Sequence, residues 1–164
     1  AENPRKLVIL DQLMAKHKND NVLIMGMYLD QLRSIAERYS DIPIITGKTS
    51  IRKREKLYDQ FRRRELKTLI VSKVANFALD LPDANVAIQV SGTFGSRQEE
   101  AQRLGRILRP KQEGQLAHFY TIVCRDTRDQ EFAANRQLFL TEQGYRYFIL
   151  YGDEVEGYKP EVGR

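Results

Sequence analysis

The sequence predicts one α/β domain with a mainly parallel sheet of about five strands flanked by helices. Short apolar, β-branched runs alternate along the chain with amphipathic stretches of helical period, which is typical of successive βαβ units. Several of these runs are apolar at consecutive positions, as strands buried on both faces require. The 164 residues, of which 41% are hydrophobic, can bury one core.

The expected strands are short and lie between helical or loop segments. A further apolar and aromatic run near the C-terminus predicts an additional edge strand, and the sequence leaves open whether this edge is antiparallel. The strands are expected at residues 22–27, 43–46, 68–72, 86–90 and 118–123, with the edge strand at 147–150.

Helices are expected in most of the segments between these strands. Asn3 and Pro4 are a capping residue and a proline at the first helical position, and Ser50 is expected to cap a basic helix that ends near Arg64. Besides these two helices, others are expected over 29–39, 98–108 and 128–142, with a structured loop over 73–85. The domain would occupy residues 1–151, and the polar residues 152–164 would form a frayed tail.

Composition narrows the function classes. The formal charge of +5 is a moderate basic excess, which fits contact with nucleic acid but also many other domains. The single Cys124 cannot form an internal disulfide, and the sequence has no cluster of metal ligands, so a reducing cytoplasmic location is expected, or a nuclear one in a eukaryote. No apolar run approaches the roughly 18 residues of a membrane span. The start at Ala1, without an initiator methionine, suggests a fragment of a longer chain.

An arginine-rich pattern, Q-x-x-G-R-x-x-R, follows the fourth expected strand at Gln102, Gly105, Arg106 and Arg109. On a helix Arg106 and Arg109 project from the same side, so their guanidinium groups can fork around the oxygens of one phosphate. Gly105 allows close approach of a ligand, and Gln102 can hydrogen-bond beside the arginines. The alternative is a solvated basic helix whose arginines pair with neighbouring glutamates.

This pattern resembles motif VI of superfamily 2 helicases, and the segment from Ser72 to Pro82 resembles their motif V. With the stretch from Leu81 to Asn85 and residues 126–145, the similarity is most specific to the DNA-repair helicases of the xeroderma pigmentosum group B family. The resemblance implies a RecA-like, P-loop NTPase-type three-layer sandwich that forms the C-terminal lobe of a two-lobe ATPase. Arg106 and Arg109 would then act as arginine fingers on a γ-phosphate held by the other lobe.

The resemblance also implies contacts to nucleic acid and to the nucleotide. Ser72 and Lys73 would contact the nucleic-acid backbone, and Arg97 would lie near DNA or the partner lobe. Asp80 would reach the ATP ribose or orient an arginine finger, although a capping role for this acid is the plain alternative. Many members of the superfamily carry glycine where this chain has Ala78, so close backbone approach is not implied at that point.

The segment after the second expected strand is a further candidate site. Hydroxyl groups, a glycine and a helix N-terminus together make a phosphate cradle, because N–H groups point outward there. A capped turn, in which Ser50 satisfies the following helix, explains the same residues. The other basic side chains of that helix are expected to form a solvated face. The candidates for contact with nucleic acid are Thr46, Gly47, Lys48, Thr49, Ser50 and Arg52.

The sequence contains no phosphate loop of its own. Gly47-Lys48-Thr49 would need a glycine five residues before Gly47, where Ile42 stands, and there is no acid box for Mg²⁺. ATP and Mg²⁺ are therefore expected mainly in an N-terminal RecA-like lobe outside these residues, and the isolated chain is expected to be inactive.

The expected function is ATP-dependent DNA helicase or translocase activity in nucleotide excision repair. The expected partners are DNA, the N-terminal lobe of the same protein and other repair proteins, with no membrane. Two alternatives remain: a lobe of a double-stranded DNA translocase or remodeller that does not separate strands, and a non-catalytic DNA-binding module.

Overall fold

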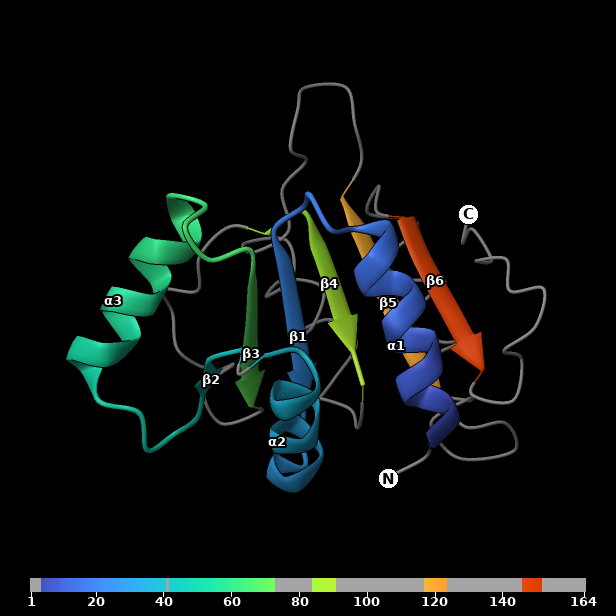
Figure 1. The fold of residues 1–164 in the computed structure, drawn as a ribbon, viewed down its shortest axis with the longest axis horizontal. Coiled ribbons are helices and arrows are strands. Elements are labelled where there is room, and N and C mark those ends of the chain that lie inside the picture. The colour runs from blue at the N-terminus through green and yellow to red at the C-terminus, as the bar shows by residue number, and fades with distance from the viewer. Residues whose placement is uncertain (1–3, 41, 73–83, 91–116, 124–145, 152–164) are drawn as a thin grey trace.

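The computed structural model describes residues 4–40, 42–72, 84–90, 117–123 and 146–151 (Figure 1). In these ranges short apolar runs form strands and amphipathic segments form helices, as the sequence predicts. The described elements are, in chain order, α1 (Pro4–Lys16), β1 (Val22–Gly26), α2 (Leu29–Arg38), β2 (Ile44–Ile45), α3 (Ile51–Arg62), β3 (Thr68–Ser72), β4 (Val86–Gln89), β5 (His118–Val123) and β6 (Arg146–Tyr151).

The described strands form one six-stranded sheet in the order β2-β3-β1-β4-β5-β6. Every neighbouring pair is parallel. The mainly parallel sheet is therefore confirmed, and the edge strand that the sequence left open is also parallel, with His118 opposite Arg146. β1 lies between β3 and β4, and its five residues are all buried, which explains why this strand is apolar at consecutive positions.

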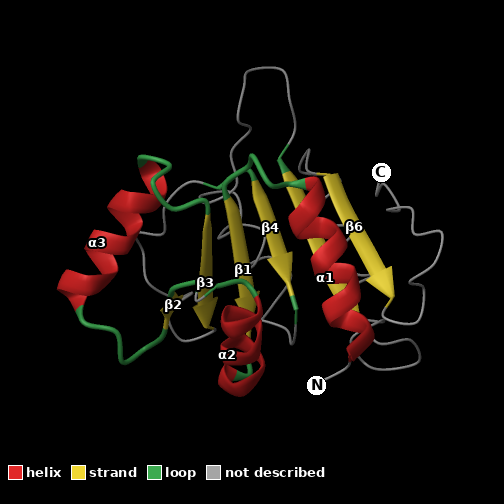
Figure 2. Ribbon diagram, viewed as in Figure 1, coloured by secondary structure: helices red, strands yellow, loops and turns green. Residues whose placement is uncertain are grey.

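Helices α1 and α2 cover the same face of the sheet (Figure 2). The core on this face takes alternate strand residues, such as Ile24, Ile70 and Ile88, together with apolar side chains from both helices. The chain runs outward from β1 to β2 and back inward to β3. The right-handed rule for parallel connections therefore places α2 and α3 on opposite faces of the sheet.

Several observed boundaries differ by a few residues from those expected. β2 contains only Ile44–Ile45, and α3 ends at Arg62 instead of continuing to Arg64. The helix stops because Arg64 adopts a φ of 63°, in the left-handed region, and this turns the chain back toward β3. The expected helices over 98–108 and 128–142, residues 73–83 of the expected loop and the tail lie outside the described residues.

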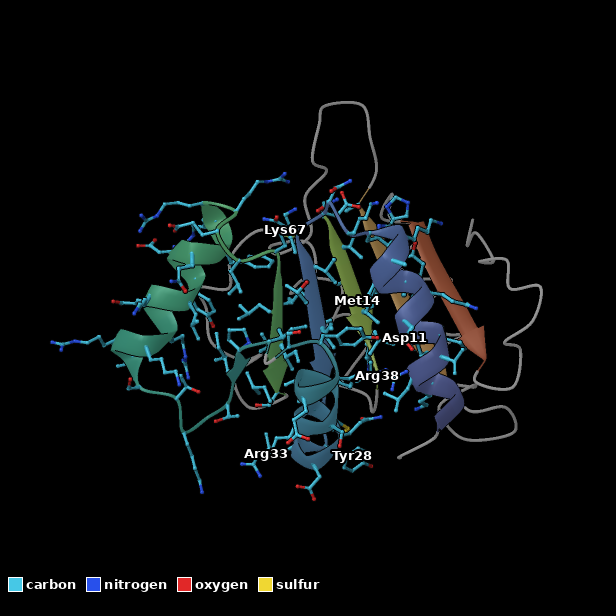
Figure 3. All side chains as sticks on the ribbon, viewed as in Figure 1. Asp11, Met14, Tyr28, Arg33, Arg38 and Lys67 are labelled. Atoms are coloured by element: carbon cyan, nitrogen blue, oxygen red, sulfur yellow. The ribbon has the colours of Figure 1, made fainter. Side chains whose placement is uncertain are left out.

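A polar tie joins α1 to α2. The guanidinium of Arg38 contacts both carboxylate oxygens of Asp11, with Nε donating to Oδ1 at 2.9 Å (Figure 3). The Tyr39 hydroxyl also donates to Asp11. The hydrogen bond from Arg38 is the main cause that lowers the pKa of Asp11, whereas burial is the main cause that raises the pKa of Tyr39. The tie fixes the two helices against each other on one face of the sheet.

Buried polar side chains also lie at the end of the sheet where the parallel strands begin. His17, just after α1, has its Nδ1 2.8 Å from Oδ2 of Asp20 and its Nε2 2.7 Å from the hydroxyl of Tyr120 on β5. Burial lowers the pKa of His17, and the neighbouring Asp20 opposes this shift. His118 packs against both rings at the start of its strand, with centroids 5.6 Å from His17 and 6.2 Å from Tyr120.

Candidate nucleic-acid interface at the carboxyl edge of the sheet

The carboxyl ends of the parallel strands meet at one edge of the sheet. Gly26 at the end of β1 pairs with Ser72 at the end of β3, and Ile45 at the end of β2 lies opposite Val71. Thr46, the next residue after β2, is thus brought close to Ser72. In open α/β sheets, ligands bind in the crevice outside these strand ends.

The segment after β2 is a turn held together by its own hydroxyl groups. The backbone N–H of Thr46 donates to Oγ1 of Thr49 at 2.9 Å, and the N–H of Lys48 donates to Oγ1 of Thr46 at 3.1 Å. The N–H of Thr49 donates to the carbonyl of Thr46 at 3.1 Å. The expected capped turn is therefore present, and its two threonine hydroxyl oxygens act as acceptors within it.

The start of α3 completes this turn. Ser50 is the N-cap residue, and its Oγ accepts from the N–H of Lys53 at 3.2 Å. One turn further along, Arg54 donates from Nη2 to the carbonyl of Thr46 at 3.3 Å. The sequence showed Arg54 only as one member of a basic run. Its position four residues after the cap was the signal that it could reach back to the turn.

The turn presents cations and hydroxyl groups together. Gly47, Lys48, Ser50 and Arg52 are exposed, and the neighbouring threonines are partly buried. A hydroxyl whose oxygen accepts a bond from the turn keeps its O–H for another acceptor. Every sequence candidate of this segment therefore lies in one compact unit at the carboxyl edge, and contact of that unit with phosphate stays a prediction.

Ser72 carries a buried hydroxyl at the same edge. The residue is 7% exposed, and its Oγ has no hydrogen-bond partner among the described residues. Gly26 stands beside it on β1 and offers no side chain. Because buried polar groups in proteins are nearly always hydrogen-bonded, this hydroxyl is a good candidate for contact with a ligand.

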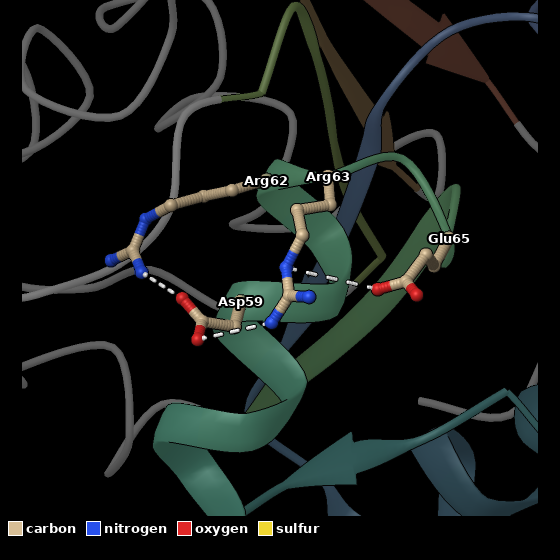
Figure 4. A network of polar contacts seen from close by, with 4 residues as sticks. All are labelled: Asp59, Arg62, Arg63 and Glu65. Carbon is tan, nitrogen blue, oxygen red and sulfur yellow. Dashed lines mark hydrogen bonds and ion pairs between the residues drawn. The ribbon is translucent and has the colours of Figure 1, made fainter.

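The far end of α3 is a solvated basic face. Asp59 binds Arg62 at 3.2 Å and Arg63 at 3.5 Å, while Arg63 lies 3.9 Å from Glu65 (Figure 4). All four side chains are at least half exposed, so these ion pairs contribute little stability. This geometry fits the expected solvated face and partly neutralises its positive charge.

Two residues that sequence reasoning missed meet at the end of β4. Nζ of Lys6, on α1, donates to the carbonyl of Val90 at 3.1 Å, and Nε2 of Gln31, on α2, donates to the same carbonyl at 3.5 Å. Lys6 is 3% exposed and Gln31 is 6% exposed. The signal in the sequence was a lysine on the apolar side of the first helix.

The other sequence candidates cannot be placed by the structure. They lie outside the described residues: Lys73, Asp80, Arg97, Gln102, Gly105, Arg106 and Arg109.

Within the described ranges, no group of three or more His, Cys, Asp or Glu side chains could hold a metal ion. None of the described helices is long and apolar enough to cross a membrane.

Solved structures define the class of fold. The chain aligns with the C-terminal domain of the DEAD-box protein Dbp5 with a TM-score of 0.72 at 15% identity, covering 90% of this chain and 85% of that one. It aligns with the C-terminal part of the Fun30 ATPase domain with a TM-score of 0.60 at 22% identity, covering 79% of this chain and 44% of that one. The fold is therefore that of a RecA-like C-terminal domain of helicase-type ATPases.

Residues 1–159 match the family described as the ERCC3/RAD25/XPB C-terminal helicase, and the chain belongs to this family. It is 55% identical over 154 residues to a DNA 3'-5' helicase XPB of Kineococcus radiotolerans, covering 94% of this chain and 28% of the relative. A protein of the same name from Mycobacterium tuberculosis is 55% identical over 152 residues, with 93% and 28% covered. This chain thus spans little more than a quarter of the length of these relatives.

The chain is also similar to a eukaryotic protein. The general transcription and DNA repair factor IIH helicase/translocase subunit XPB of Enterocytozoon bieneusi is 38% identical over 156 residues, covering 92% of this chain and 26% of the relative. The similarity therefore extends beyond the bacterial proteins.

Proposed function

We propose that this chain is the C-terminal ATPase lobe of an ATP-dependent DNA helicase or translocase that acts in nucleotide excision repair. The observation that carries this proposal is membership of the helicase family along residues 1–159, together with 55% identity to proteins named DNA 3'-5' helicases. The activity would belong to a longer protein, which works on DNA with other repair proteins in the cytoplasm or, in a eukaryote, the nucleus.

Nucleotide would lie between this lobe and an N-terminal one. Arg106 and Arg109, with Gln102 beside them, would present guanidinium groups to the γ-phosphate, where such groups stabilise developing negative charge. Gly105 would allow the nucleotide to approach the backbone, and Asp80 would bind the ribose or orient an arginine. The sequence has neither a phosphate loop nor an acid box for Mg²⁺, so the proposal assigns Mg²⁺, which would neutralise phosphate charge, mainly to the other lobe.

The carboxyl edge would grip the DNA backbone. Lys48 and Arg52 would supply positive charge, while Thr46, Thr49 and Ser50 would donate their hydroxyl hydrogens to phosphate oxygens, with Gly47 leaving room for close approach. The buried hydroxyl of Ser72 fits the same role, and Lys73 and Arg97 would add charge nearby. Contacts of this kind recognise the backbone, so the proposal predicts weak sequence preference and strong salt dependence.

ATP binding would close the two lobes, and hydrolysis would allow them to reopen while each lobe holds the DNA in turn. A ligand can drive such a cycle only through different affinities for the two states. The arginines supply this difference because they would reach the γ-phosphate only in the closed state.

The isolated chain tests this division of labour. Because it has no phosphate loop, it should hydrolyse ATP no faster than buffer, whereas the full-length protein should show turnover that DNA stimulates. A phosphate-release assay with and without DNA measures both rates. Clear turnover by the pure isolated chain would contradict the proposed sandwich.

The DNA contact is tested by salt titration of DNA binding in the full-length protein. Lys48→Ala and Arg52→Ala should each weaken binding to all sequences alike and reduce the slope of log affinity against log salt by about 1. Lys18 is exposed and lies just before the start of β1, away from the carboxyl edge. Lys18→Ala is therefore the matched control and should leave the slope unchanged. Unaltered slopes in both variants would refute the proposed interface.

The second candidate is duplex translocation without strand separation, because the relative from E. bieneusi is named a helicase/translocase. A strand-displacement assay distinguishes the two, since a pure translocase would hydrolyse ATP on duplex DNA without releasing a labelled strand.

A further inference from the structure

Thr46 is the residue on which the turn after β2 is built. Its N–H donates to Oγ1 of Thr49 at 2.9 Å, and its own Oγ1 accepts from the N–H of Lys48 at 3.1 Å. Its carbonyl accepts twice, from the N–H of Thr49 at 3.1 Å and from Nη2 of Arg54 at 3.3 Å. Because Arg54 lies inside α3, its bond fixes the Thr46 carbonyl relative to that helix.

Arg54 is an unfavourable residue for stability alone. The first turn of α3 contains no acidic residue, so the cations near its start meet the positive end of the helix dipole without compensation. Within the ranges that the structure describes, Arg54 forms no ion pair and its buried Nε has no hydrogen-bond partner. Methionine would keep the apolar stem and avoid both penalties. The arginine therefore indicates a requirement beyond packing.

The orientation of the turn matters because the turn presents the proposed DNA contacts. Lys48 lies within it, and Arg52 stands two residues after the cap Ser50. Both basic residues are exposed. A binding loop that is already ordered loses less conformational entropy when its partner arrives, so it binds more tightly with the same contacts.

We propose that Arg54 is a positioning residue for the DNA-binding turn: its bond to the Thr46 carbonyl holds the turn in its binding conformation before DNA arrives. This inference rests on the proposed function. Arg54 acts through the backbone of the turn, and the contacts with phosphate belong to its neighbours. Its loss should therefore loosen the turn and weaken DNA binding with little change in the stability of the fold.

The first measurement needs no DNA. Hydrogen exchange of the full-length protein, resolved on peptides over residues 44–51, should be faster by about threefold or more in Arg54→Met, because the turn opens more often. Peptides over β1 should exchange as in wild type. The melting temperature should stay within about 2 °C of wild type, since the lost hydrogen bond is offset by removal of the buried, unpaired Nε.

The second measurement is the affinity of the full-length protein for DNA. Arg54→Met should weaken binding about tenfold, the change expected when one charge-assisted hydrogen bond is lost. Arg54→Lys should bind within about threefold of wild type, because one nitrogen makes the bond and an ammonium can replace it. Arg62→Met is the matched control: this arginine is exposed at the far end of α3, where it pairs with Asp59, and its loss should leave affinity unchanged.

A double-mutant cycle separates positioning from direct contact with DNA and from damage to the fold. If Arg54 acts through the turn, Arg54→Met should cost less than about twofold in a protein that already carries Lys48→Ala and Arg52→Ala. Unchanged exchange over residues 44–51, or an equal loss of affinity in both backgrounds, would overturn the positioning role. Wild-type DNA binding by the Lys48→Ala, Arg52→Ala protein would instead defeat the proposed interface, so the two failures are distinguishable.

Discussion

At the scale of single residues, buried polar groups lie at both ends of the parallel strands, which we call the carboxyl edge and the amino edge of the sheet. At the carboxyl edge, Ser72 and Lys6 place a hydroxyl and an ammonium group where strands end. At the amino edge, His17 lies between Asp20 and Tyr120 and ties α1 to β5. The first edge is where the candidate ligands would bind, and the second stabilises the fold.

His17 should make stability depend on pH. Its pKa in the folded chain lies below the ordinary value of 6.5, mainly because it is buried, so the unfolded chain binds more protons in that range. Stability should rise with pH from the lowered pKa up to about 6.5 and fall as pH drops through this window, by at most about 1.4 kcal/mol per pH unit. Urea unfolding from pH 5 to 7.5 measures it.

His17→Gln is the matched variant, since it cannot titrate. The wild-type chain should lose more stability than His17→Gln as the pH falls below 6.5. Parallel profiles for the two proteins would show that His17 makes no contribution.

At the scale of elements, the helices are joined to one another as well as to the sheet. Asp11 accepts from Arg38 and Tyr39, which links α1 to α2, and Arg54 links α3 to the turn that precedes it. The unit of α1 and α2 holds the end of β4, and α3 holds the turn after β2. The end of β4 and the turn that carries the candidate DNA contacts are thus each held by side-chain hydrogen bonds to a backbone carbonyl.

Asp11→Asn should weaken the link between α1 and α2. Arg38 lowers the pKa of Asp11 below 3.8, so the contribution is complete above that pH and is lost as pH falls through the lowered value. At neutral pH the melting temperature should fall by roughly 2 °C, since the pair is partly exposed.

Thermal unfolding of both proteins as a function of pH tests this link. The difference between Asp11→Asn and wild type should shrink below pH 3.8. A difference that persists at the lowest pH would contradict the role of the charged carboxylate.

Much of the fold is predictable from the sequence, because strands buried on both faces leave apolar runs and helices leave periodic ones. The capped start of α3 at Ser50 was also predictable, since capping is local. The direction of β6 was not, because strand pairing depends on distant residues. The end of α3 was missed because Arg64, and not glycine, adopts the left-handed conformation.

The residues of the candidate site likewise include some that local sequence could indicate and some that it could not. The turn residues from Thr46 to Ser50 could be predicted to lie together because they follow one strand and start one helix; their contact with DNA stays a prediction. Lys6 and Gln31 were missed because their shared acceptor, the Val90 carbonyl, lies far along the chain. Only the folded chain brings these three residues together.

At the scale of the whole molecule, the chain is a RecA-like lobe of the ERCC3/RAD25/XPB C-terminal helicase family. Its sheet places the turn after β2, the end of β3 and the end of β4 along one edge. Under the proposed function this edge would face DNA and a second lobe. The chain spans 28% of the length of its bacterial relatives.

The most direct test of the central claim is ATP turnover by the full-length protein carrying Arg106→Ala or Arg109→Ala, measured beside nucleotide affinity. If the arginines act on a γ-phosphate held by the other lobe, DNA-stimulated kcat should fall by roughly a thousandfold while nucleotide binding stays close to wild type. Near-normal turnover in both variants would contradict the account.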